Sequence, residues 1–118
     1  MTTRPDHGHE LIARPKQTPE AVRVALARVA PHQLSDMERH KEQAIAAALT
    51  DGEIGHLQHW LTYWLAQVEI ERRPELSARY RVALAAVHGT VDRDDPAFRS
   101  GMNDLAAVEA EARRPASA

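Results

Sequence analysis

The sequence predicts an all-α fold, a single domain of about five short helices packed around a central helix rich in Trp and Leu. Apolar residues recur at intervals of three and four, and no stretch shows the alternation typical of a strand. Capping residues, Pro and Gly stand where helices begin and end. The chain has 118 residues, of which 43% are hydrophobic, and this length suits one domain.

The two ends of the chain are expected to lie outside the packed domain. Residues 1–17 carry Pro, Gly and scattered charge, with Leu11 and Ile12 as their main apolar pair. This composition is typical of a flexible arm with at most one anchoring contact. Residues 18–113 form the predicted helical domain, and residues 114–118 are a tail.

The first two helices are predicted from their termini. The first begins after Thr18, a capping residue followed by Pro, and ends before Pro31. The second is expected to begin near Ser35, which forms a Ser-x-x-Glu capping box with Glu38. Gly52 ends this helix, because Gly tolerates the left-handed conformation of a helix C-cap.

The third helix is expected to run from about Glu53 to Arg72 and to form the centre of the domain. Its apolar residues follow the helical period and are Ile54, Leu57, Leu61, Trp64, Leu65 and Val68. Trp64 is predicted to lie in the core, with Trp60 beside it at the edge of the same face. Tyr63 projects away from this face and is predicted to be the surface aromatic residue.

The last two helices follow a Pro and an Asp-Pro step. Pro74 breaks the third helix, because proline restricts the preceding residue and lacks an amide donor. The fourth helix covers Glu75 to His88. The fifth begins after Asp95, again a capping residue followed by Pro, and fades at Arg113.

Composition and charge exclude several classes of protein. The formal net charge is −2, so the chain offers no general attraction to phosphate backbones, and nucleic-acid binding is not expected. The absence of Cys excludes disulfides, thiolate catalysis and Cys-based metal centres. No apolar run reaches the roughly 18 residues of a membrane span, and the first residues lack the apolar core of a secretory signal. We therefore expect a cytoplasmic protein.

Catalytic motifs are missing from the sequence. Its serines lie at helix starts, on exposed helical positions or in the tail, and none follows the Gly-rich elbow of a nucleophilic serine. No phosphate-binding loop is present. Short Ala-rich helices seldom enclose a pocket with paired acid and base groups. We expect no enzymatic activity and no cofactor.

One group of side chains has the spacing of metal ligands. Glu53 and His56 form a Glu-x-x-His pair, and His59 follows one turn later. Di-metal helical bundles use two such motifs with two further Glu residues, and the nearest second candidate here is Asp36 with His40. The motif is incomplete, so we predict no native metal site, and a metal-binding bundle is kept as an alternative.

Binding of another protein is the leading functional prediction. Trp60 and Tyr63 are candidate anchors, because Trp and Tyr are enriched at the energetic centres of interfaces. Arg72 and Arg73 are candidates for docking an acidic protein surface, because guanidinium groups pair with carboxylates. An Ala-rich core buries little area, which favours a homodimer. A nucleic-acid-binding regulator that reads through its fourth helix is the alternative.

The order of elements resembles a family of small, uncharacterised actinobacterial all-helical proteins. The matching features are the start at Thr18-Pro19-Glu20-Ala21-Val22-Arg23, the Pro31 break, the helix ending in Ala46-Ala47-Ala48-Leu49, the Leu57, Leu61 and Trp64 helix, and the Pro74-Glu75 step before Tyr80. The resemblance covers roughly residues 15–85 and does not extend to residues 96–113. Members are similar in size and gene neighbourhood to antitoxin-like proteins encoded beside small ribonuclease toxins. The resemblance therefore implies a neutralising, protein-binding role and assigns it to no residue.

Overall fold

A computed structural model describes residues 10–90 and 92–114, and in these ranges the chain is helical with no strand. This confirms the predicted all-α single domain and its helices. The elements are α1 (Pro19–Val29), a 3₁₀ turn η1 (Pro31–Gln33), α2 (Leu34–Asp51), α3 (Gly55–Arg72), α4 (Pro74–His88) and α5 (Pro96–Ala112). Each boundary falls within a few residues of its predicted place.

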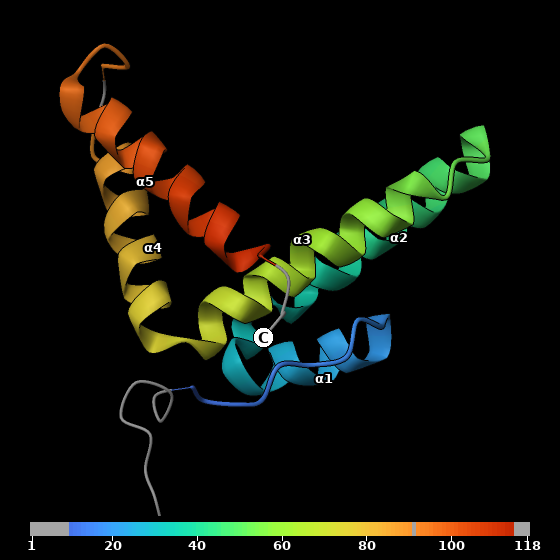
Figure 1. Cartoon of the computed structure of the whole chain (residues 1–118). Helices are drawn as coiled ribbons and strands as arrows, with labels where there is room; N and C mark the ends of the chain where they lie inside the picture. The colour runs from blue at the N-terminus through green and yellow to red at the C-terminus, as the bar shows by residue number, and fades with distance from the viewer. Residues whose placement is uncertain (1–9, 91, 115–118) are drawn as a thin grey trace, which may run out of the picture.

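The helices form two antiparallel hairpins that diverge like the arms of a V (Figure 1). The α2–α3 hairpin forms one arm and the α4–α5 hairpin the other, while α1 packs near the point where they meet. The radius of gyration is 16.2 Å, whereas a compact chain of this length has about 13 Å. The open V therefore leaves much of each arm without a neighbour.

Helix α3 is the centre of the fold, as predicted, because it contacts all four other α-helices. Its middle joins α1 and the beginning of α2 in one apolar cluster, which contains Trp60, Trp64 and Val68. Its last turns join α4 and α5 in a second cluster around Ile70. Trp64 is 3% exposed and Trp60 is 5% exposed, so both indoles belong to the core.

The predicted caps are present at two helix starts and one helix end. The Thr18 hydroxyl accepts a hydrogen bond from the Ala21 amide at 3.2 Å, and the Asp95 carboxylate accepts one from Ala97 at 2.8 Å. Gly52 has a φ of 75° and ends α2 in the left-handed conformation. These local signals act within a few residues, and sequence alone is enough to find them.

The predicted capping box of α2 is wrong. The 3₁₀ turn that starts at Pro31 runs directly into α2, so the helix begins at Leu34 and Ser35 already lies in its first turn. Gln33 occupies the N-cap position, with no hydrogen bond from its side chain to the helix. Glu38 accepts a hydrogen bond from Arg23 of α1 at 2.8 Å instead of reaching back to the helix start.

The described part of the N-terminal arm is docked, where a flexible segment was predicted. The Leu11 amide donates to the Arg72 carbonyl at 2.8 Å, and Ile12 packs against the core cluster of α1, α2 and α3. Arg14 reaches Glu69 of α3. Residues 1–9 of the predicted arm, and residues 115–118 of the predicted tail, lie outside the described residues.

Candidate interaction surface

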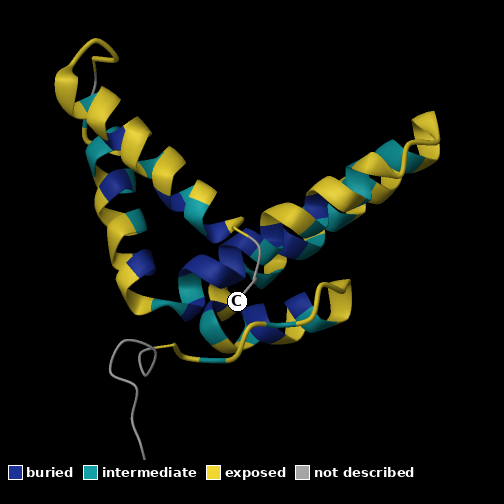
Figure 2. Cartoon of the chain, in the orientation of Figure 1, coloured by how far each residue is buried: buried dark blue, intermediate teal, exposed yellow. Residues whose placement is uncertain are grey.

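The part of the α2–α3 hairpin on either side of its turn, residues 43–63, is here called the outer hairpin. Only Trp60 is buried in it, and every other residue is intermediate or exposed. Figure 2 shows the contrast between this arm, which is largely exposed, and the buried second half of α3. The outer hairpin therefore packs mainly on itself and presents most of its side chains to the surroundings.

This exposed arm is almost without charge. Asp51 and Glu53, both beside the turn, are its only Asp, Glu, Lys or Arg residues, although such residues make up 27% of the whole chain. Solvated helical surfaces are normally rich in charged side chains, and the centres of protein interfaces are depleted in them. The outer hairpin thus has the composition of an interface.

A groove of about 740 Å³ runs between α2 and α3 on one face of this hairpin. We call it the aromatic groove. Its lining residues are His40, Gln43, Ala44, Ala47 and Asp51 from α2, Glu53 from the turn, and Gly55, His56, His59, Trp60, Tyr63 and Trp64 from α3. Ala44 and Ala47 on the α2 side and aromatic rings on the α3 side contribute to a mostly apolar concave surface.

The aromatic wall of the groove is held rigidly. The Trp60 indole N–H donates to the Met37 carbonyl at 3.1 Å, which fixes the ring against α2. Tyr63 meets Trp64 edge to face, with ring centroids 5.1 Å apart, and the His40 ring lies 5.8 Å from that of Trp64 at a tilt of 42°. Tyr63 is 37% exposed and is the accessible aromatic residue that the sequence predicts.

The phenol of Tyr63 remains a hydrogen-bond donor at neutral pH. Partial burial raises its pKa above the ordinary value, and the neighbouring Tyr80 and Glu109 add to the effect. Its ring and hydroxyl together offer a partner one apolar and one polar contact. These properties suit Tyr63 to the anchoring role predicted for it.

The candidate metal ligands are separated by the geometry of the turn. His56 Nε2 lies 2.7 Å from the Asp51 carboxylate, which also accepts the Glu53 amide at 2.9 Å. The contact with His56 lowers the pKa of Asp51 below its ordinary value, and the Glu53 amide assists. In the described ranges, Glu53, His56 and His59 do not form a group of ligands that could hold a metal ion.

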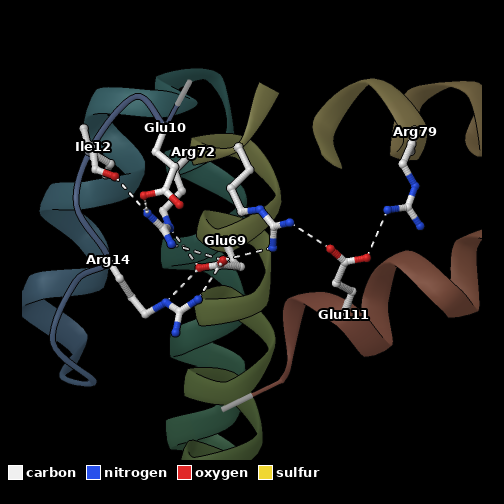
Figure 3. Close-up of polar contacts among 8 residues, drawn as sticks. Glu10, Ile12, Arg14, Glu69, Arg72, Arg79 and Glu111 are labelled. Atoms are coloured by element: carbon white, nitrogen blue, oxygen red, sulfur yellow. Dashed lines mark hydrogen bonds and ion pairs between the residues drawn. The ribbon is translucent and has the colours of Figure 1, made fainter. Parts of the chain in front are cut away.

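The predicted arginine candidates lie at the junction of the two arms, away from the groove. Arg72 is only 4% exposed. Its guanidinium donates to Glu69 at 2.8 and 3.2 Å, to Glu10 at 2.9 Å and to the Ile12 carbonyl at 3.0 Å (Figure 3). These contacts join α3 to the N-terminal segment.

The same junction ties α3 to the other arm. Arg73 donates to Glu69 at 3.4 Å and to Glu111 of α5 at 2.7 Å, and Arg79 of α4 donates to Glu111 at 3.0 Å (Figure 3). Hydrogen bonds from Arg79 and, as the second largest cause, from Arg73 hold the pKa of Glu111 below its ordinary value. Arg72 and Arg73 are thus engaged within the molecule, whereas Trp60 and Tyr63 both line the groove.

The groove offers little covalent chemistry. His56 and Asp51 form a pair that can orient a base, but no Ser, Thr, Cys or Lys lines the groove to act as a nucleophile.

No helix within residues 10–90 and 92–114 combines the length and apolar character needed to cross a bilayer. Comparisons of the chain with protein families, curated proteins and solved structures find no match.

Proposed function

We propose that the protein is a cytoplasmic, non-enzymatic interaction module that binds an amphipathic helix of a partner protein in the aromatic groove. The observation that carries the proposal is the outer hairpin itself, which is exposed along a whole arm of the molecule yet nearly uncharged. A surface of this kind, with a concave apolar centre and aromatic residues in it, resembles the unoccupied half of an interface.

A helix is the partner element that fits this groove best. The groove follows the axes of α2 and α3, and Ala44 and Ala47 allow another backbone to approach α2 closely. A third helix laid there would complete a three-helix arrangement, which is a common mode of peptide recognition. The groove is open at the surface, whereas sites for small molecules enclose most of the ligand.

The polar groups around the groove favour one orientation of a bound helix. His40 and Gln43 offer hydrogen-bonding groups at the inner end, and Asp51 and Glu53 place negative charge beside the turn. We therefore expect a bound helix to be apolar on the groove side and to carry a Lys or Arg near the turn. The product of a neighbouring toxin gene, which the antitoxin-like resemblance suggests, is the first candidate partner.

Photo-cross-linking in the native host tests this proposal. Benzoylphenylalanine in place of Tyr63 should give one discrete adduct with a different protein, because the ring lies in the groove. The same group at Val82, an exposed residue of α4, should not give that adduct.

A matched pair of variants provides the control. Ala47→Glu places a charge in the groove and should reduce the adduct by about tenfold or more, whereas Ala46→Glu, exposed and outside the lining, should leave it unchanged.

Three results would overturn the proposal of a protein partner in the groove. Equal amounts of adduct with Ala47→Glu and Ala46→Glu would place the contact elsewhere. Removal of the adduct by nuclease would favour the nucleic-acid-binding alternative. An adduct of two copies of this chain would make the groove a site of self-association.

A further inference from the structure

We infer that the partner helix lies in the aromatic groove parallel to α3, with its N-terminus at the turn and its C-terminus at the inner end, beside His40 and Tyr63. The inference rests on the proposed function and adds the direction of the bound helix, its length and the charge near its first turn. It follows from the polar groups at the two ends of the groove, which differ in kind.

The groove has the length of two to three turns of helix. Its lining runs from Gly55 to Trp64 along α3 and from His40 to Asp51 along α2. Nine residue steps of an α-helix correspond to roughly 14 Å. A bound helix of about ten residues therefore has both of its ends beside polar residues of the groove. This matters because the first amides and the last carbonyls of any helix lack partners within the helix.

The turn end of the groove offers negatively charged acceptors. Asp51 and Glu53 are both exposed there. The contact with His56, assisted by the Glu53 amide, holds the pKa of Asp51 below its ordinary value, so this carboxylate is charged at neutral pH. The dipoles of α2 and α3 have opposite signs at the turn and largely cancel. Unpaired amides and partial positive charge mark the N-terminus of a helix, which is therefore the end that this site favours.

The inner end of the groove offers donors instead. The Tyr63 hydroxyl, the Gln43 side-chain amide and the His40 ring line it, and each of these groups carries at least one O–H or N–H. Partial burial raises the pKa of Tyr63, so its hydroxyl keeps the proton at neutral pH. These donors can pair with the unpaired carbonyls at the C-terminus of a helix.

Charged residues outside the lining do not reverse this difference. Arg39 donates to Asp36 at 2.7 Å, and Lys41 lies 4.0 Å from Glu38, so each pair is close to neutral. Both signs also meet on α5, where the nearby charges act on Tyr63 in opposite directions. The flanking residues not yet named are Glu42, exposed on α2, and Glu109 and Arg113 of α5. Within the lining itself, the only Asp, Glu, Lys or Arg residues are those at the turn.

The direction specifies the partner more closely. We expect a short amphipathic helix that carries a Lys or Arg in its first turn or just before it, where the cation reaches Asp51 or Glu53. A helix bound the other way would place its C-terminal carbonyls against these two carboxylates, and partial negative charge would meet full negative charge. Its N-terminal amides would meet the donors at the inner end.

Removal of one negative charge at either end tests the role of the turn carboxylates. With benzoylphenylalanine at position 63, Glu53→Gln should reduce the adduct about threefold or more. Glu42→Gln, the same change at an exposed position beside the inner end and outside the lining, should leave the adduct unchanged. Equal yields from the two variants would overturn the inference.

Cross-linking from the two ends of the groove tests the direction itself. Benzoylphenylalanine replaces Gly55 at the turn or Gln43 at the inner end, both exposed residues of the lining. A Cβ added at Gly55 meets no atom within 4 Å, so the turn position accepts a side chain. The two positions are roughly 12 Å apart along the hairpin, which corresponds to about eight residues of helix. Mass spectrometry of the adducts from the native host should show that the partner residue captured at position 43 follows the one captured at position 55 by about eight residues.

The order of the captured residues decides the result. The reverse order would overturn the inference, and so would capture of two separate segments of the partner. Either result is compatible with an adduct at position 63, so the inference would then fail while the proposed function stands. Absence of the adduct at position 63 would overturn the proposed function and this inference with it.

Discussion

Replacement of Glu69 by Ala should lower the free energy of unfolding by about 3–5 kcal/mol, the largest effect expected of any single polar substitution in this chain. Glu69 is 4% exposed and accepts hydrogen bonds from Arg14, Arg72 and Arg73. Its removal would leave the buried guanidinium of Arg72 without its main carboxylate partner. It would also release the N-terminal segment from α3. Urea unfolding at a fixed protein concentration measures the change.

An exposed ion pair provides the control for this prediction. Arg23 and Glu38 are 2.8 Å apart, but their side chains are 55% and 37% exposed. Arg23→Ala should therefore lower the free energy of unfolding by at most about 1 kcal/mol. If Glu69→Ala cost no more than Arg23→Ala, the buried cluster would not be what holds the N-terminal segment on α3.

The same carboxylate should make stability depend on pH. Burial acts to raise the pKa of Glu69, but hydrogen bonds from Arg72 and Arg14 outweigh it and hold the pKa below the ordinary value. A lowered folded-state pKa gives stability that is present above the unfolded pKa of about 4.3 and is lost as the pH falls through the folded value. Glu69→Gln should therefore flatten the loss of stability below about pH 5. The pH dependence of stability that remains in this variant reflects Glu111, Asp51 and Asp36, whose pKa values also lie below their ordinary values.

Trp64→Ala should be equally severe, with a loss of about 3–5 kcal/mol in the free energy of unfolding. The indole is 3% exposed and lies in the cluster that joins α1, α2 and α3. Its removal leaves a cavity in a core that has little other aromatic volume, because aromatic residues make up 4% of the chain. Circular dichroism should follow the unfolding, because the variant lacks one of the two tryptophans that report by fluorescence.

The neighbouring residue provides the matched comparison. Tyr63→Ala removes the adjacent aromatic side chain, but Tyr63 is 37% exposed and meets Trp64 in a T-shaped contact. We expect a loss of about 1 kcal/mol in the free energy of unfolding. Equal losses from the two substitutions would contradict the division of this helix into a core face and a binding face.

Much of the helical architecture could be predicted because its causes are local. Thr18, Asp95, Gly52 and Pro74 act on backbone groups within one turn, and each marks a helix end as expected. The central position of α3 followed from apolar periodicity alone. The capping box at Ser35 was wrong for a local reason too, since the helix had already begun in the preceding 3₁₀ turn.

The junction of the two arms could not be predicted in the same way. Glu69 pairs with Arg14 and Arg72 with Glu10 across 55 and 62 residues of chain. In sequence, Glu69, Arg72 and Arg73 have the three- and four-residue spacing of a solvated helix face. Their burial arises only when the N-terminal segment and α5 dock on α3. Long-range docking of this kind leaves no signal in a single sequence.

The uncharged surface, in contrast, was visible in the sequence. Between Gln43 and Val68 the only Asp, Glu, Lys or Arg residues are Asp51 and Glu53. An analysis of helical periodicity considers only the spacing of apolar residues, so it predicts that such a stretch is core. It takes no account of the absence of charged residues. The structure adds that most of residues 43–63 are exposed, and exposure combined with absence of charge is the property that indicates an interface.

Solvent access to the outer hairpin inside the native host tests this account most directly. The chain contains no cysteine, so single cysteines can be labelled with a maleimide one at a time. Gln43→Cys places the label in the groove lining, whereas Gln58→Cys places it at an exposed position outside that lining. Both changes leave the apolar residues of the groove in place. Ser100→Cys, exposed on α5, is the reference.

In dilute purified protein, all three cysteines should react at similar rates. In host cells, labelling at position 43 should be slower by about tenfold or more relative to position 100, because a partner covers the groove. Position 58, which lies outside the groove lining, should remain more reactive than position 43. Equal rates at all three positions in cells would contradict the claim that this arm is an interaction surface.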